Sequence, residues 1–357
     1  MLQSDVLAMG AFTQAFEAGV AALADRRFGV ACSSGTAGLH MGVRALGIGK
    51  GDEVITTPFS FVASANCFLY EGAVPRFVDI EEDSLGLDPD RVESAATPRT
   101  RAVLPVHVFG RPCRIDAATS LARSHGWAVI EDACEGLGSS VGERPLGSFG
   151  DVAVFAFYPN KQITTGEGGM VVTDDAALAD TMRSLRNQGR DTDGTWLRHV
   201  RLGYNYRLDE MSAAVGVAQL ERLAELRAGR ARVAAAYGRA LGGIDWITLP
   251  RAGANESVDW FVYVVRLDSG IDRDGVIREL GALGIPSRPY FSPIHLQPFY
   301  RSTFGFEPGD FPVTERVAAS TLALPFSSRL TEDEVGQVVE SLRQVVRGQS
   351  GGRSGSS

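Results

Sequence analysis

The alternation of short apolar runs with helical patterns is the feature that most constrains the fold. Apolar runs typical of strands lie at residues 28–32, 53–57, 74–78, 102–106, 127–131, 152–157 and 170–173. Helical patterns lie at 11–25, 35–46, 60–70 and 115–125. Strands that alternate with helices predict a mainly parallel β-sheet covered by helices on both faces, an α/β fold. Such sheets bind ligands beyond the carboxyl ends of their strands.

The pattern changes in the last third of the chain. An Ala- and Arg-rich stretch without proline predicts one long helix from 209 to about 241, which would bridge two domains. We then expect a strand at 260–267, a helix at 272–283, a loop-like segment at 290–300, and a last helix opened by the capping box of Thr331 and Glu334. These patterns predict a large domain over 1–240, a small α+β domain over 241–347, and a flexible tail over 348–357.

Composition excludes several classes of protein. The formal net charge of -8 argues against a general nucleic-acid binder, and no apolar run approaches the roughly 18 residues of a membrane helix. Asp5 precedes every Lys and Arg, so we expect no signal peptide. The four cysteines form no CxxC pair, which argues against structural zinc and for reduced thiols in the cytoplasm. We expect no metal site and no membrane partner.

A candidate anion site lies at residues 33–36, where Ser-Ser-Gly-Thr follows a strand and opens a helix. Free backbone N–H groups and the helix dipole favour an anion there, Gly35 permits close approach, and Thr36 adds a hydroxyl group. A plain N-cap has the same signature, so this motif alone is weak evidence. Neither GxGxxG nor GxxxxGK[ST] occurs, which removes the main support for a dinucleotide site or a P-loop.

Two further candidates follow other strands. Glu131 and Asp132 end the strand at 127–131, where a carboxylate needs a cation, a hydrogen-bond donor or a protonated ligand nitrogen. Lys161 follows the strand at 152–157 and precedes a Gly-rich turn. Only two of the 35 basic residues are lysines, and the other, Lys50, lies in a glycine turn typical of solvated loops. Desolvation at a strand end would favour a neutral, nucleophilic amine at Lys161.

Together, these three features match the needs of pyridoxal 5'-phosphate. A phosphate cradle anchors this cofactor, a carboxylate keeps its pyridine nitrogen protonated, and a lysine forms the Schiff base. The order of the features along the chain also fits one ligand bound at several strand ends.

Six stretches also resemble a known family, the pyridoxal-phosphate-dependent aminotransferases of nucleotide-sugar biosynthesis (the DegT/DnrJ/EryC1/StrS group). They are SSGTAGLH at 33–40, GDEVITTPFSFVASAN at 51–66, VIEDACEGLGS at 129–139, FYPNKQITTGEGGMVVTDD at 157–175, GYNYRLDEMSAAVGVAQL at 203–220 and PIHLQPFY at 293–300. The resemblance extends from about residue 29 to 300, with weaker similarity to about 342. One stretch alone would be weak evidence, whereas six in family order and spacing are highly specific.

The resemblance implies the aspartate-aminotransferase fold (fold type I), with a large α/β/α domain and a small C-terminal domain, in a homodimer with active sites at the subunit interface. Lys161 matches the Schiff-base lysine, which also moves protons between cofactor and substrate. Asp132 matches the partner of the pyridine nitrogen, and Glu135 matches the residue near the ring hydroxyl. Phe61 matches the aromatic residue that stacks on the ring, although on sequence alone an ordinary core position is the commoner explanation for such a residue.

The remaining positions concern the phosphate and the substrate. Gly35 and Thr36 match the phosphate loop, and Asn205 matches an asparagine that reaches the phosphate from the neighbouring subunit. Tyr290 and His295 lie in the segment that lines the sugar-nucleotide pocket of the family. A turn position would also explain Asn205, and a structural role would also explain His295.

The chain departs from the family pattern in two places. Many relatives carry a serine five residues before the lysine, where its hydroxyl contacts the phosphate, and this chain has Ala156 there. Relatives also carry a further short segment ahead of the helix at 11–25, so we expect this chain to start late. That segment often borders the substrate pocket.

The function implied by the resemblance is transfer of an amino group, with glutamate as donor, to a keto-sugar nucleotide. Sugar deoxygenation by a related enzyme is one alternative, but those relatives carry His at the position of Lys161. A non-catalytic regulatory protein that binds the same cofactor is the other alternative. The complete set of catalytic positions favours an enzyme.

Overall fold

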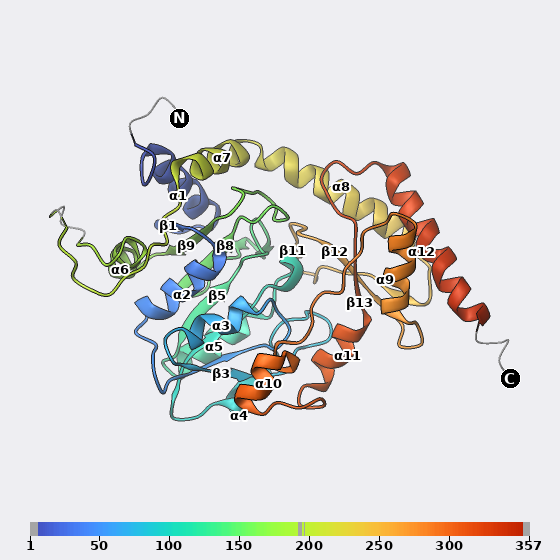
Figure 1. Cartoon of the computed structure of the whole chain (residues 1–357), viewed down its shortest axis with the longest axis horizontal. Helices are drawn as coiled ribbons and strands as arrows, with labels where there is room; N and C mark the ends of the chain where they lie inside the picture. Colours follow the sequence, from blue (N-terminus) through green and yellow to red (C-terminus); the bar gives the residue numbers. More distant parts are fainter. Residues whose placement is uncertain (1–5, 192–194, 196, 353–357) are drawn as a thin grey trace.

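The computed structural model describes residues 6–191, 195 and 197–352. Its centre is a seven-stranded sheet with the strand order β1-β9-β8-β5-β4-β2-β3. A smaller part at the other end of the long α8 helix carries a three-stranded sheet of order β10-β12-β13 (Figure 1). Another small sheet has the order β11-β6-β7.

The elements of the first part alternate as the sequence predicts. In chain order they are α1 (Ala11–Leu23), β1 (Phe28–Cys32), α2 (Gly35–Ala45), β2 (Glu53–Thr56), α3 (Ala63–Leu69), β3 (Val74–Phe77), η1 (Pro89–Arg91), α4 (Val92–Ala95), β4 (Thr100–Leu104), η2 (Val108–Gly110), α5 (Ile115–Ser124), β5 (Ala128–Asp132), β6 (Ser140–Val141), β7 (Arg144–Pro145), β8 (Val152–Ala156), β9 (Gly169–Thr173) and α6 (Ala176–Arg186).

The remaining elements complete the fold. They are α7 (Glu210–Glu221), α8 (Leu223–Leu241), β10 (Ile247–Thr248), β11 (Glu256–Ser257), β12 (Tyr263–Leu267), α9 (Arg273–Ala282), η3 (Ile294–Leu296), α10 (Pro298–Phe304), α11 (Pro312–Ser320), β13 (Thr321–Leu324) and α12 (Glu332–Gly352).

The large sheet is mainly parallel, as predicted. Strands β3, β2, β4, β5 and β8 pair in parallel, whereas β9 runs antiparallel to both β8 and β1. A parallel pair needs a crossover connection, usually a helix. The connection from β8 to β9 contains no helix and carries Lys161, so these strands pair antiparallel and the connection stays at one end of the sheet.

Alternate residues of each strand face opposite layers of helices. In β2, Val54 joins the core formed with α2, α3 and α6, whereas Ile55 joins the core formed with α4 and α5. In β8, Val154 faces the α2 side and Phe155 packs with Phe16 of α1. This alternation follows from the two-residue period of a strand. It explains why the central strands are apolar on both faces.

The smaller part has a core of its own. The second half of α8, strands β10, β12 and β13, and helices α9 and α12 bury a separate apolar cluster around Tyr237, Val265 and Leu342. Helix α12 begins with the predicted capping box, in which Glu334 accepts from the Thr331 N–H (2.8 Å) and Thr331 Oγ1 accepts from the Glu334 N–H (3.2 Å).

Three sequence predictions need correction. The helix predicted at 209–241 is two helices, because Arg222 leaves helical geometry (ψ 6°) between α7 and α8. The loop predicted at 290–300 contains η3, and Pro298 opens α10 at the first helical position, where proline is favoured. Residues 348–352, predicted to start a flexible tail, belong to α12, which continues to Gly352, and the rest of that predicted tail, 353–357, lies outside the described residues.

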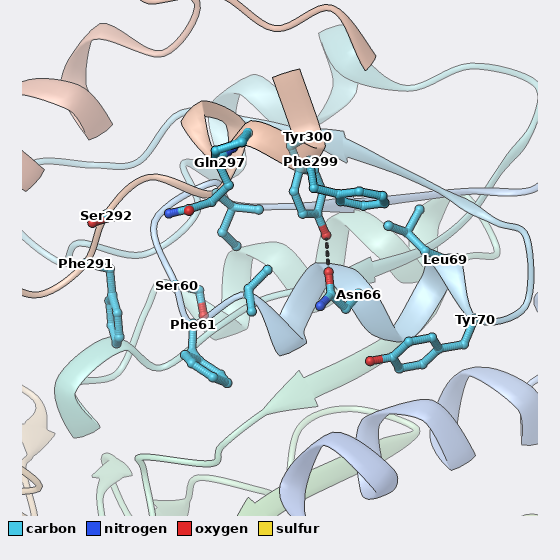
Figure 2. Close-up of a pocket in the computed structure, with 13 residues that line it drawn as sticks. Ser60, Phe61, Asn66, Leu69, Tyr70, Phe291, Ser292, Gln297, Phe299 and Tyr300 are labelled. Carbon is cyan, nitrogen blue, oxygen red and sulfur yellow. Dashed lines mark hydrogen bonds between the residues drawn. The ribbon is translucent and has the colours of Figure 1, made fainter. Parts of the chain in front are cut away.

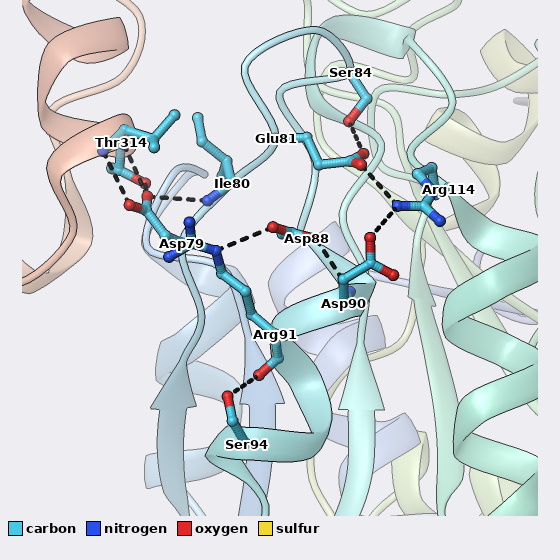
Figure 3. A network of polar contacts seen from close by, with 11 residues as sticks. Asp79, Ile80, Glu81, Ser84, Asp88, Asp90, Arg91, Ser94, Arg114 and Thr314 are labelled. Atoms are coloured by element: carbon cyan, nitrogen blue, oxygen red, sulfur yellow. Dashed lines mark hydrogen bonds and ion pairs between the residues drawn. The ribbon is translucent and has the colours of Figure 1, made fainter.

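A polar junction joins the loop after β3 to helix α11 of the smaller part (Figure 3). Asp79 accepts hydrogen bonds from the backbone N–H of Val313 (2.9 Å) and from the N–H and hydroxyl of Thr314 (2.8 Å each). A buried carboxylate at a helix N-terminus is stabilised by these free N–H groups. Glu81 of the same loop pairs with Arg114, the residue before α5, and Arg114 also pairs with Asp90 of η1.

Candidate active site

The carboxyl ends of β5 and β8 and the N-terminus of α2 open into one cavity of about 680 Å³. Segments from 60–63 and 289–291 close it from the other side. The lining includes the following predicted site residues: Gly35, Thr36, Phe61, Asp132, Glu135, Lys161 and Tyr290. The structure therefore brings seven of the nine predicted positions into one place.

Lys161 lies in the connection between β8 and β9, with 13% of its side chain exposed. Its Nζ is 3.4 Å from Glu135 Oε1 and 4.2 Å from the ring centre of Phe261. Its backbone is fixed as well, because the Arg230 guanidinium donates to the Lys161 carbonyl (2.8 Å). The amine is thus held at a defined place by both the main chain and its surroundings. Lys50 is exposed in a turn, as predicted.

Asp132 ends β5 and is almost fully buried. Its Oδ2 accepts from the Ser64 hydroxyl (2.6 Å) and its Oδ1 accepts from the Cys134 N–H (3.1 Å). No described Lys, Arg or His lies within ion-pair distance of this carboxylate, although it lines the cavity. A buried carboxylate with hydrogen bonds but no cation of its own favours a protonated nitrogen on a ligand.

Glu135 stands between Lys161 and the cavity wall. Its Oε2 accepts from the Phe109 N–H (2.8 Å), and Phe109 has a left-handed backbone (φ 62°) that directs this N–H toward the carboxylate. Burial raises the pKa of the Glu135 carboxyl, and the positive charge of Lys161 opposes that rise. Glu135 can therefore hold a proton within reach of the lysine more readily than an exposed glutamate would.

The segment predicted to form an anion cradle lies at the N-terminus of α2. Ser34 is the N-cap residue, and its hydroxyl accepts from the Ala37 N–H (3.1 Å), while Gly35 and Thr36 line the cavity. A Cβ atom on Gly35 would lie 2.8 Å from the Ala156 Cβ and 3.0 Å from Cys134 Sγ, so only glycine fits there. Burial raises the pKa of the Cys134 thiol well above its usual value, which keeps it neutral.

A second cavity, of about 880 Å³, continues from the first (Figure 2). The two cavities share Ser60, Phe61 and Phe291. Phe61 is 61% exposed, so it is not an ordinary core residue. In Figure 2, Tyr300 donates to Asn66 (2.7 Å) on the wall away from Phe291. Together, these cavities form a long, largely apolar space next to Lys161.

Two predicted residues lie outside these cavities. The His295 side chain is fully buried, and its Nε2 lies 3.1 Å from Glu315 Oε1, so in this chain it is absent from the lining of both cavities and its contact with substrate stays a prediction. Phe311 packs against its ring. Asn205 is exposed and pairs through its backbone with Asn187, outside the cavity of its own chain.

Sequence reasoning missed three residues around the lysine and Asp132. Arg230 of α8 donates to the carbonyl groups of Lys161 (2.8 Å) and Phe261 (2.9 Å), Phe261 places its ring beside the Lys161 amine, and Ser64 bonds Asp132. Ser60 and Ser64 are spaced as one polar face of a helical turn, which is the only local signal. Arg230 is one arginine among many in α8, so its role becomes visible only in three dimensions.

The sequence profile of the DegT/DnrJ/EryC1/StrS aminotransferase family matches residues 1–343. The chain belongs to this family. This membership and the arrangement of the sheet confirm the predicted fold class and family.

Individual relatives of this aminotransferase are sugar-modifying proteins. The chain is 40% identical to the GDP-perosamine synthase of Caulobacter vibrioides, over 96% of this chain and 92% of the relative. It is 39% identical to the UDP-N-acetyl-3-dehydro-alpha-D-glucosamine 3-aminotransferase of Acidithiobacillus ferrooxidans, over 94% and 89%. The structure of S. venezuelae DesV in complex with a ketimine intermediate superposes with a TM-score of 0.90 and 37% identity, over 96% and 91%.

The described part of the chain offers neither a cluster of metal ligands nor a membrane-spanning helix. Among residues 6–191, 195 and 197–352, no three His, Cys, Asp or Glu side chains gather in a way that could hold a metal ion. Within the same residues, no helix combines the length and apolar character needed to cross a bilayer.

Proposed function

We propose that this protein transfers an amino group from glutamate to a keto-sugar nucleotide, with pyridoxal 5'-phosphate as cofactor and Lys161 as the lysine that holds it. The observation that carries the proposal is the cavity that unites Lys161, Asp132 and the Gly35–Thr36 cradle. The sugar-nucleotide names of relatives at 40% and 39% identity support the substrate class. Deoxygenation is disfavoured because the chain carries lysine, and not histidine, at position 161.

The residues that line the cavity match the pyridine nitrogen, the phosphate group and the ring of this cofactor. Asp132 is buried without a cation of its own, so a protonated pyridine nitrogen would complete its environment. Gly35 and Thr36 line the cavity at the N-terminus of α2, where a helix favours a phosphate, and Phe61 is exposed where a ring would stack. When bound, pyridoxal phosphate supplies an electron sink for the carbon that loses its proton.

The residues of the chain then supply the proton transfers. The Lys161 amine lies beside the Glu135 carboxylate (3.4 Å) and the Phe261 ring (4.2 Å), on the wall of the cavity that the cofactor would occupy. Once displaced by the donor, that amine can take a proton from the donor carbon and return it on the other side of the transfer. Asp132 would stabilise the positive charge on the pyridine nitrogen of the bound cofactor. Glu135, at 3.4 Å from the Lys161 amine, is placed to accept a proton from that amine and to return it.

Substrate would enter from the larger cavity. Its 880 Å³ and its continuity with the Lys161 cavity leave room for a nucleotide beyond the reacting sugar, and Tyr290 and Phe291 border the passage. The apolar lining of this space suits the faces of a sugar and a base more than free charges.

We also propose a homodimer with shared active sites. Asn205 is exposed outside its own cavity, and Leu202, Met211 and Val215 near it are exposed apolar residues, which supports burial against a second copy. A cytoplasmic location is supported by the four cysteines, all of which are free thiols. The separate apolar core around Tyr237 supports the proposed division into domains near residue 240.

A test starts from purified protein. We expect visible absorbance from the bound cofactor, its loss on addition of glutamate, and trapping of the cofactor on Lys161 by borohydride. A panel of GDP-, UDP- and dTDP-linked keto-sugars with glutamate as donor would identify the acceptor by its amine product. A colourless protein that borohydride does not label would contradict the cofactor, and a coloured protein without amine product would favour the regulatory alternative.

A further inference from the structure

A third cavity, of about 420 Å³, lies between the large sheet and the smaller part of the molecule. Its walls come from the loop after β3, from η2 and the residue that follows it, from the segment 248–253, and from 260–266. It shares no lining residue with the cavities described above. Phe109 lines this third cavity, while its backbone N–H faces Glu135 in the first.

Arg111 is the unusual residue of this cavity. Its Nε is buried without a hydrogen-bond partner, and no described Asp or Glu lies within ion-pair distance of its guanidinium. Burial lowers the pKa of Arg111. An arginine remains charged even so, and a buried charge without a partner is costly to the fold. The other arginines of the lining do not share this state, because Arg266 pairs with Glu82 (3.1 Å) and Arg251 is exposed.

The neighbouring carboxylates do not neutralise Arg111. Glu81 and Asp90 pair with Arg114, and Asp88 pairs with Arg91, as Figure 3 shows. Glu82 pairs with both Arg266 and Arg316. Asp83 and Glu256 act on Arg111 only at a distance. Four acidic groups of this region thus pair with other arginines, Asp83 lines the cavity without an ion pair, and the Arg111 guanidinium faces the cavity without a partner among the described residues.

We propose that this third cavity is a binding site for a small multivalent anion that carries phosphate or carboxylate groups. Arg111 would supply a fork of parallel N–H donors, which matches both groups, and Arg251 and Arg266 would add positive charge on the side of the smaller part. The volume admits a molecule of the size of a sugar phosphate. Because its walls come from both parts of the chain, the bound anion would hold them together across the junction.

The test measures anion binding to the holoenzyme, in which the cofactor already occupies the Lys161 cavity. Pyrophosphate and citrate serve as probes of the phosphate and carboxylate classes, with sodium chloride at matched ionic strength as the control for screening. We expect at least one probe to bind once per chain by calorimetry and to raise the melting temperature by about 2 °C or more near saturation. The probe that binds more tightly identifies the class.

Two variants of Arg111 test whether the anion binds in this cavity. Arg111→Met should raise the melting temperature in anion-free buffer, because it removes an uncompensated charge, and should abolish the rise caused by the anion. Arg111→Lys keeps the charge without the fork and should weaken binding by about 10-fold. Arg239→Met is the matched control, since Arg239 is exposed and pairs only with the exposed Glu332, and it should keep the full anion response.

Three results would count against the proposal, and the first two would overturn it outright. The first is a wild-type protein that neither probe stabilises beyond the chloride control. The second is a full anion response in both Arg111 variants, which would place the anion elsewhere, for example in the cofactor cradle. A lower melting temperature of Arg111→Met in anion-free buffer would show that the protein itself stabilises Arg111, and that result also counts against the site.

Discussion

The cavities around Lys161 and Arg111 each contain a largely buried basic side chain, but the surroundings of the two side chains differ. Lys161 has a carboxylate at 3.4 Å and an aromatic ring at 4.2 Å within its own chain. Arg111 has no such partner among the described residues. An amine that exchanges its proton during a reaction benefits from a nearby carboxylate that can accept that proton. A guanidinium stays charged, so without an ion-pair partner it is stabilised when an external anion binds to it.

One short segment separates the two cavities. Phe261 faces Lys161, and Trp260, Val262 and Val264 line the Arg111 cavity. This alternation is that of extended chain, in which successive side chains point to opposite sides. The segment is anchored at Asp259, whose carbonyl accepts from the side chain of Gln162, the residue after the lysine. We call the segment 260–264 the partition between the Lys161 cavity and the Arg111 cavity. Substitutions of residues that line one cavity can be compared with substitutions of residues that line the other.

The largest effect is expected for Lys161→Arg. A guanidinium can neither bond the cofactor aldehyde nor move the proton, so amine formation from a keto-sugar nucleotide should fall by about 10³-fold or more. The matched control is Lys50→Arg, since Lys50 is exposed in a turn and the chain has no third lysine. Turnover by Lys161→Arg at the wild-type rate would contradict the proposal that Lys161 bonds the cofactor and transfers the proton.

Asp132→Asn should have the next largest effect. An amide cannot keep a pyridine nitrogen protonated as a carboxylate does, so kcat should fall by about 100-fold or more while the KM for glutamate changes less. Ser64→Ala is the graded comparison, because it leaves the Asp132 carboxylate in place and removes the hydrogen bond to its Oδ2 (2.6 Å), together with the contact between the Ser64 and Ser60 hydroxyls (2.7 Å). Initial rates at saturating donor would measure both. Equal losses in the two variants would mean that Asp132 acts only as a structural acceptor.

The sequence predicts the local parts of this arrangement well. Strand and helix alternation places the ends of β5 and β8 at one edge of the sheet, which brings Asp132 and Lys161 together without any knowledge of long-range contacts. The cradle at Gly35 is also local, because it needs only a strand end and a helix start. Its dependence on Ala156 and Cys134 as neighbours is not visible in the sequence.

Contacts between distant segments account for what the sequence did not reveal. The break at Arg222 carries neither glycine nor proline, so periodicity alone predicts a continuous helix. His295 is buried by Phe311 and Glu315, which approach only after α11 has folded onto the Asp79 junction. Arg111 could not be recognised from the sequence for the same reason. Its lack of an ion-pair partner depends on where the surrounding carboxylates lie in the folded chain.

A pH effect is expected at the partition. Burial raises the pKa of Asp259 to about 6, above its ordinary value of 3.8, even though Arg227 lies at 2.7 Å. The folded state therefore binds this proton more tightly, and its stabilisation is present below about pH 4 and is lost as the pH rises through 6. Asp259→Asn should remove this dependence and gain about 2 kcal/mol relative to wild type between pH 4 and 7.

Denaturant unfolding at several pH values would measure that difference. The two proteins should diverge between pH 4 and 7, and parallel curves would mean that Asp259 is not buried as a proton-binding carboxyl. Because Asp259 holds Gln162 through its backbone carbonyl and not through its side chain, the variant should retain the position of Lys161. Cofactor absorbance in the same samples would check that point.

The smallest effect concerns the position that departs from the family. Ala156 lies beside Gly35 at the cradle, and a serine there would add one hydroxyl donor toward a bound phosphate. One added hydrogen bond is worth about 0.5–1.5 kcal/mol, so Ala156→Ser should lower the cofactor Kd by about 2- to 10-fold. Equilibrium dialysis would measure it. Anion binding at the Arg111 cavity should stay unchanged, because the two cavities share no lining residue. A parallel change in both affinities would instead mean that the partition transmits the occupancy of one cavity to the other.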